Sequence, residues 1–168
     1  EGAIPAESPQ KAETDQGGIN VAASVALNIV TVSNEAYIPA GVQVISGGTL
    51  KIEAFGNTDG KAKADSSAVK ANDEDPDAKV GVGVAVAINV VNTDTKAWIE
   101  EGAMVIAGGL EITAGMFEVG EGEDAESINT FEAIAISGAG SANIGVAGAA
   151  AINVVNNNVL AYTSGDIH

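Results

Sequence analysis

Three stretches of the chain alternate between branched aliphatic residues and small residues. In the second stretch, one set of alternate positions holds valine or isoleucine from Val80 to Val90, and the other set holds Gly81, Gly83, Ala85, Ala87 and Asn89. Alternation of this kind predicts a β-strand with two different faces. We expect the aliphatic face to form the core. We interpret the small residues Gly81, Gly83, Ala85 and Ala87 as a flat face for packing or assembly, because an exposed strand face normally carries polar side chains.

The alternating stretches are copies of one another. The residues around Asn28 recur around Asn89, 61 residues later, and around Asn153, a further 64 residues later. A long period of apolar units is typical of a solenoid, in which each unit buries its core against its neighbours. We expect residues 1–16 to form an extended arm or the end of a preceding unit. Residues 17–168 then form one β-repeat domain, with copies at about 17–79, 80–142 and 143–168, the last of them partial.

Shorter elements complete each predicted copy. Polar residues at 31–35 and 92–96 predict turns after the long strands, and short strands follow them. The pairs Gly47-Gly48 and Gly108-Gly109 predict corners with positive φ. Alternating alanine predicts one further strand in each copy, at residues 61–68 and 131–137. The chain is therefore predicted to be all-β, as a β-solenoid of parallel coils or, alternatively, as an antiparallel β-sandwich.

Equivalent positions of successive solenoid units stack, so the repeated side chains predict ladders. Asn28, Asn89 and Asn153 are expected to form an amide ladder. An aromatic residue follows each of these asparagines by nine positions, at Tyr37, Trp98 and Tyr162. We interpret this second set as a structural seam. A carbohydrate-binding strip is the alternative interpretation.

Charge narrows the classes of function. The net charge is −16, and the chain holds no arginine and no cysteine. It therefore cannot neutralise phosphates as a general nucleic-acid binder does, and it has no disulfides or thiolate metal sites. The most apolar run, residues 80–91, is too short and too rich in Gly and Ala for a transmembrane helix, which predicts no membrane span in this segment.

Catalytic residues are scarce, whereas carboxylates are abundant. The one histidine is His168, and no histidine or arginine lies beside the acidic runs, so we expect no enzymatic activity. Asp73, Asp75 and Asp77 alternate in a loop and could direct several oxygen atoms at one calcium ion, although no loop fits the EF-hand pattern. A solvated acidic loop is the alternative, and no other cofactor is predicted.

The repeated phrase at residues 105–114 resembles the rungs of filamentous-haemagglutinin-like secreted proteins. The longer unit, with its Ile-Asn-Val-Val, Lys-Ala-Trp-Ile and Gly-Gly phrases, is similar to repeats of leukotoxin-like and other giant bacterial surface proteins. The resemblance covers about residue 17 to the end. It implies a right-handed parallel β-helix at the bacterial cell surface or outside the cell.

The function that this resemblance implies is that of a structural or adhesive repeat segment. Its expected partners are neighbouring repeats, copies of itself, and host or environmental surface glycans or proteins. Two alternatives stay open from the sequence. The chain could be a subunit of a self-assembling extracellular filament, or a β-helix that acts on polysaccharides.

Overall fold

The computed structural model describes residues 19–67, 80–119, 127–140 and 144–168, and every regular element in them is a β-strand. The strands are β1 (Ile19–Ile38), β2 (Gln43–Phe55), β3 (Gly60–Ser67), β4 (Val80–Ile99), β5 (Met104–Gly115), β6 (Phe131–Gly138), β7 (Ile144–Thr163) and β8 (Asp166–Ile167). The predicted all-β class is confirmed. The predicted additional strands near residues 61–68 and 131–137 are confirmed as β3 and β6.

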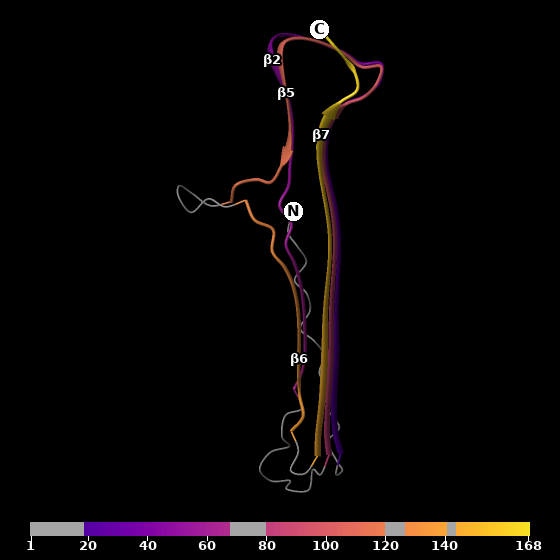
Figure 1. The fold of residues 1–168 in the computed structure, drawn as a ribbon, viewed down its shortest axis with the longest axis vertical. Helices are drawn as coiled ribbons and strands as arrows, with labels where there is room; N and C mark the ends of the chain where they lie inside the picture. Colours follow the sequence, from indigo (N-terminus) through magenta and orange to yellow (C-terminus); the bar gives the residue numbers. More distant parts are fainter. Residues whose placement is uncertain (1–18, 68–79, 120–126, 141–143) are drawn as a thin grey trace. The chain divides into compact units, whose positions relative to one another are not determined.

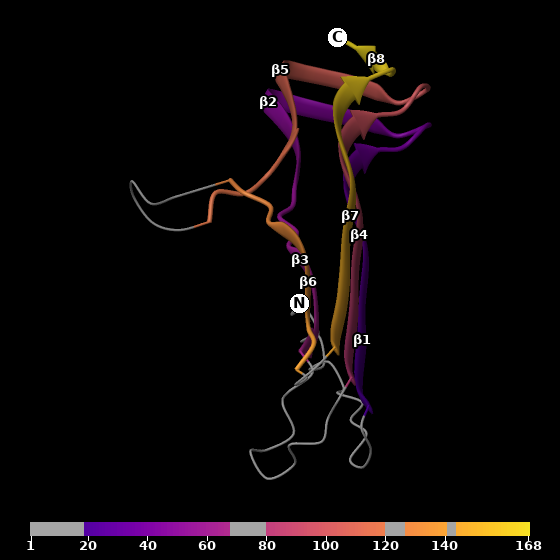
Figure 2. The same ribbon diagram turned by 60° about the horizontal axis from the view of Figure 1, so that its bottom comes forward.

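The strands form three sheets, ordered β1–β4–β7, β2–β5–β8 and β3–β6 (Figures 1 and 2). β5 lies parallel to both β2 and β8, and β3 is parallel to β6. We call the sheet of the 20-residue strands β1, β4 and β7 the long sheet. Four residues of β4 each form a hydrogen bond with the residue 64 positions later in β7, namely Asn89, Asn92, Thr93 and Asp94. Such a constant offset requires parallel strands. We call neighbouring strands in a sheet successive tiers. Parallel pairing contradicts the antiparallel β-sandwich alternative.

Two predicted details are wrong. The polar residues at 31–35 and 92–96 lie inside the 20-residue strands β1 and β4 instead of forming turns, and in β4 the side chains of residues 92–94 bond to the next tier. The glycine pairs are not positive-φ corners. In the described residues, positive φ occurs only at Gly41 (78°) and Gly102 (85°), where the backbone N–H of Gly41 donates to the carbonyl of Gly102. The Gly47-Gly48 region instead carries a register shift between β2 and β5.

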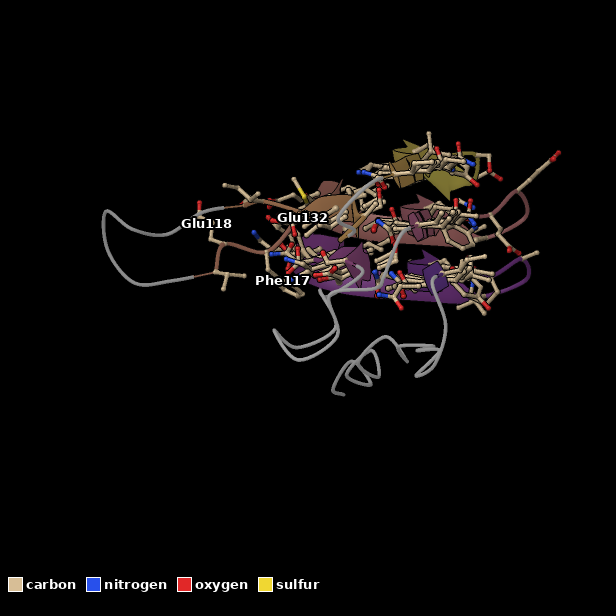
Figure 3. The ribbon with its side chains drawn as sticks, turned by 90° about the horizontal axis from the view of Figure 1, so that it is seen from below. Phe117, Glu118 and Glu132 are labelled. Atoms are coloured by element: carbon tan, nitrogen blue, oxygen red, sulfur yellow. The ribbon has the colours of Figure 1, made fainter. Side chains whose placement is uncertain are left out.

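The described residues fall into two compact units, and each unit contains strand segments from every tier. Unit 1 contains β3, β6 and the first parts of the long strands, up to residues 29, 91 and 155. Unit 2 contains the remaining parts of the long strands together with β2, β5 and β8. Figure 3 shows the sheets from one end, with their strands in tiers and side chains on both faces.

Unit 1 has a core of alanine and glycine between two closely packed sheets. Its buried cluster consists of Ala62 and Ala64 from β3 and Ala85 and Ala87 from β4. A Cβ atom added at Gly83 would collide with the carbonyl oxygen of Gly138 and lie 2.8 Å from that of Ser66. Because the backbones of the two sheets approach so closely at Gly83, only small side chains fit between them there.

The branched aliphatic core predicted for the alternating stretches is therefore wrong for this part of the chain. In unit 1 the aliphatic positions of the long strands point away from the alanine core, and Val25 is 71% exposed. Along Gly83, Ala85 and Ala87, the narrow space between the sheets admits methyl groups and hydrogen atoms but not branched side chains, whereas the larger Asn89 and Val91 are buried farther along β4.

Unit 2 has a conventional aliphatic core. Ile38, Ile52, Ile99 and Val105 are buried there together with three alanines. The inward set of alternate positions in β1 and β4 therefore carries small residues in unit 1 and larger ones at the unit 2 end.

Candidate functional site

The repeated asparagines form a continuous amide ladder in unit 1. The Asn28 side chain donates to Asn89 Oδ1 at 2.7 Å, and Asn89 Nδ2 donates to Asn153 Oδ1 at 2.9 Å. Two of these amides also donate to the facing sheet, Asn89 Nδ2 to the Gly60 carbonyl and Asn153 Nδ2 to the Phe131 carbonyl. Asn89 has no exposed surface, and its amide is bonded on both sides because a carboxamide both donates and accepts.

The repeated aromatic residues stack in unit 2. The ring centroids of Tyr37 and Trp98 are 4.5 Å apart, and their ring planes differ by 5°. For Trp98 and Tyr162 the centroid distance is 6.2 Å and the interplanar angle is 9°. Nearly parallel rings at these separations attract one another through dispersion and complementary charge distribution. Each tyrosine stacks on the central Trp98, so the ring faces between the tiers are already in contact. The geometry is therefore that of a seam between tiers, and carbohydrate binding along it stays a prediction.

A polar ladder beside the aromatic stack was missed by the sequence prediction. Asn156 donates to Asn92 Oδ1 at 3.1 Å, Thr93 donates to Asn157 at 2.9 Å, and Asn158 donates to Asp94 at 2.9 Å. The common spacing of 64 residues, already evident from Asn89 and Asn153, could have identified these pairs.

The polar ladder shifts the pKa values of two partly exposed groups, Asp94 and Lys96. The hydrogen bond from Asn158, followed by the one from Lys96, lowers the pKa of Asp94 below its ordinary value. Lys96 Nζ lies 3.0 Å from Asp94 Oδ1, and that hydrogen bond raises the pKa of the Lys96 ammonium group.

Ion pairs also join the tiers of the shorter sheets. Lys51 Nζ on β2 lies 2.6 Å from Glu111 on β5, and the hydrogen bond with Glu111 raises the pKa of Lys51. Lys61 on β3 pairs with Glu132 on β6, which is labelled in Figure 3. All four side chains are substantially exposed, so each pair contributes little stability, but opposite charges at paired positions favour this register.

The predicted small face lies in the unit 1 core. Ala85 and Ala87 are fully buried against the β3–β6 sheet, and Gly83 is in close contact with its backbone. Gly81 faces the same side, since a Cβ atom there would lie 2.7 Å from the Gly140 carbonyl oxygen.

The opposite side of the long sheet in unit 1 is a surface that we call the aliphatic face. It consists of the odd positions from Ile19 to Ile29 in β1 and the even positions from Val80 to Val90 in β4 and from Ile144 to Val154 in β7. Leu27 (61%), Ile29 (64%) and Ile152 (47%) are among its exposed side chains. The alternation itself revealed this set of residues, but the prediction placed them in the core.

The predicted calcium ligands Asp73, Asp75 and Asp77 lie outside the described residues. Among the residues that are described, no group of three or more His, Cys, Asp or Glu side chains is placed to hold a metal ion. Calcium binding stays a prediction from the sequence.

No protein-family model, curated protein or solved structure matches this chain. Within the described part of the chain, no helix is long and apolar enough to cross a membrane. The evidence that bears on function is therefore the geometry of the side-chain contacts between tiers. Its recurring feature is that chemically similar side chains bond or stack from tier to tier.

Proposed function

We propose that this chain is a coiled segment of a right-handed parallel β-helix that serves a structural or adhesive role in a large secreted bacterial surface protein. The observation that supports this most directly is the constant register of the long sheet. The amide ladder and the polar ladder share one offset of 64 residues between β4 and β7. A sheet that adds one coil at a time in fixed register can lengthen without changing its cross-section.

The bonding pattern supports a structural role better than a catalytic one. The asparagine amides and the aromatic rings of the repeated positions interact chiefly with their counterparts on neighbouring tiers. A stalk or an extended adhesive surface needs this arrangement, because each coil must hold the next one in register.

Insertion of one extra repeat tests whether the chain winds as a solenoid, with one coil formed by each repeat of about 64 residues. We would insert a second copy of residues 89–152 between Ile152 and Asn153, which adds the 64 residues of one repeat in phase. In a solenoid, stability grows with each unit and its interface to the next. The insertion should therefore raise the melting temperature and increase the β-signal in circular dichroism.

A half-length insertion is the matched control. Repeating residues 89–120 at the same site adds 32 residues of the same kind but displaces Asn153 by half a coil, which should lower the melting temperature. If the in-phase insertion destabilises the chain as much as the half-length insertion does, the coil repeat is wrong.

The surface role is tested separately in the bacterium that carries the gene. Antibodies raised against the purified chain should label intact cells, and protease added outside the cells should remove the label. Label that appears only after the cells are opened would contradict the surface role without affecting the solenoid.

A further inference from the structure

The aliphatic face of unit 1 is uncharged over three neighbouring strands. Its 18 positions are all Ile, Val, Leu, Ala or Gly. Exposure is substantial on each strand, with Val25 at 71%, Val84 at 46% and Val146 at 54%. Soluble monomers seldom leave a continuous apolar patch larger than a few hundred Å² in water.

The size of the face is sufficient for a protein contact. A Val, Leu or Ile side chain offers roughly 100 Å² of apolar surface. Ten side chains of the face are 42–71% exposed, so together they present on the order of 500 Å². Two such faces would remove on the order of 1,000 Å² from water, with partly exposed neighbours adding to that. This approaches the lower limit for a specific interface of about 1,200 Å².

The charge of the chain favours a second copy of it, in place of an anionic membrane, as the partner that covers the aliphatic face. The whole chain carries a net charge of −16, so two copies repel one another over most of their surface. The aliphatic face is a region where two copies can meet without opposing carboxylates. An anionic membrane would repel the same chain, and the face carries no lysine with which to bind lipid headgroups.

We propose that the aliphatic faces of two copies of this chain pack against each other as a two-fold symmetric dimer. The parallel rows of branched side chains are self-complementary, because the rows of one face can fill the grooves between the rows of the other. This pairing is lateral, so it differs from the tier-on-tier stacking of the solenoid and does not depend on the adhesive role.

Sedimentation of charge variants tests the dimer. The variant Leu27→Lys with Ile29→Lys places two ammonium groups in the proposed contact. Thr31→Lys with Ser33→Lys is the matched control, because these exposed residues continue the same outward row of β1 into unit 2. We expect the parent and the control to form dimers at protein concentrations of roughly tens of micromolar. The dissociation constant of the Leu27→Lys/Ile29→Lys variant should rise at least about 100-fold, since unpaired charges would be buried.

Salt and conservative variants provide independent measurements. Higher salt should strengthen the dimer, because it screens the repulsion between acidic copies. Leu27→Thr with Ile29→Thr should weaken the dimer while retaining strand propensity, so it replaces the lysine variant if that variant fails to fold. An unchanged circular dichroism spectrum identifies the variants that remain folded.

Cross-linking locates the contact. The chain contains no cysteine, so Val86→Cys introduces a single thiol at the centre of the aliphatic face. A short bis-maleimide should join two copies of Val86→Cys but not two copies of the control Thr31→Cys.

Four results would overturn the proposal. They are a parent that stays monomeric at high protein and salt concentration, a dimer that survives both threonine substitutions, cross-linking at Thr31→Cys but not at Val86→Cys, and binding to phosphatidylcholine vesicles in place of dimerisation.

Discussion

The central asparagine of the amide ladder should be far more important for stability than the asparagines on either side. Asn89 is fully buried and participates in three hydrogen bonds, with Asn28, Asn153 and the Gly60 carbonyl. Asn89→Ala removes all three and leaves the carbonyl of the buried Gly60 without this bond, whereas Asn28 is partly buried and Asn153 is exposed. A hydrogen bond contributes about 1 kcal/mol net, and an unsatisfied buried partner costs about 1–3 kcal/mol. We expect the free energy of unfolding to fall by about 3–5 kcal/mol.

Asn28→Ala is the matched control, because Asn28 donates one ladder bond from a partly buried position. It breaks one bond and leaves Asn89 Oδ1 without its donor, so it should cost about 1–3 kcal/mol, less than Asn89→Ala. Asn89→Asp separates hydrogen bonding from packing, because it keeps the shape of the side chain but replaces the amide donor with a carboxylate that cannot donate. This variant should be at least as unstable as Asn89→Ala at neutral pH.

Urea denaturation followed by circular dichroism measures these differences, provided that the slope of stability against urea stays constant among the variants. Equal losses for Asn89→Ala and Asn28→Ala would refute the reasoning, because burial would then add nothing to the importance of the central amide. Full stability of Asn89→Asp would refute the donor role.

Three further predictions concern the sheet contact, pH and calcium. Gly83→Ala should destabilise by about 1–3 kcal/mol or more because its Cβ meets backbone oxygens, whereas Gly148→Ala, with open space around it, should be neutral or slightly stabilising in the same urea assay. The pKa of Asp94 lies below its ordinary value of 3.8, so its bonds stabilise the fold above that pH and are lost as the pH falls through the lowered value. Asp94→Asn should therefore lose less stability than the parent between about pH 5 and about pH 2, and an equal loss would contradict this. Millimolar calcium should raise the melting temperature if Asp73 and Asp75 are ligands. Asp73→Asn with Asp75→Asn should abolish this increase. Identical melting curves with calcium and with chelator would show that the loop is solvated and binds no calcium.

Much of the chain's order could be predicted from spacing. The repeated asparagines and aromatic residues lie at the intervals that bring them together on successive tiers. The alternation identified which residues share a face of the long strands, and alternating alanine located β3 and β6. The polar segments were misread as turns, because turn propensity is local whereas the bond from Thr93 to Asn157 spans 64 residues.

Alternation by itself determined that each long strand has two faces and which residues lie on each. It could not determine which face turns inward, because that depends on the strand that packs against it. Hydrophobicity favoured burial of the aliphatic residues, yet in unit 1 the facing strand β3 presents Ala62 and Ala64, and its backbone lies against Gly83. Only small side chains fit that separation, so the tertiary contact placed the alanines inside and the valines outside.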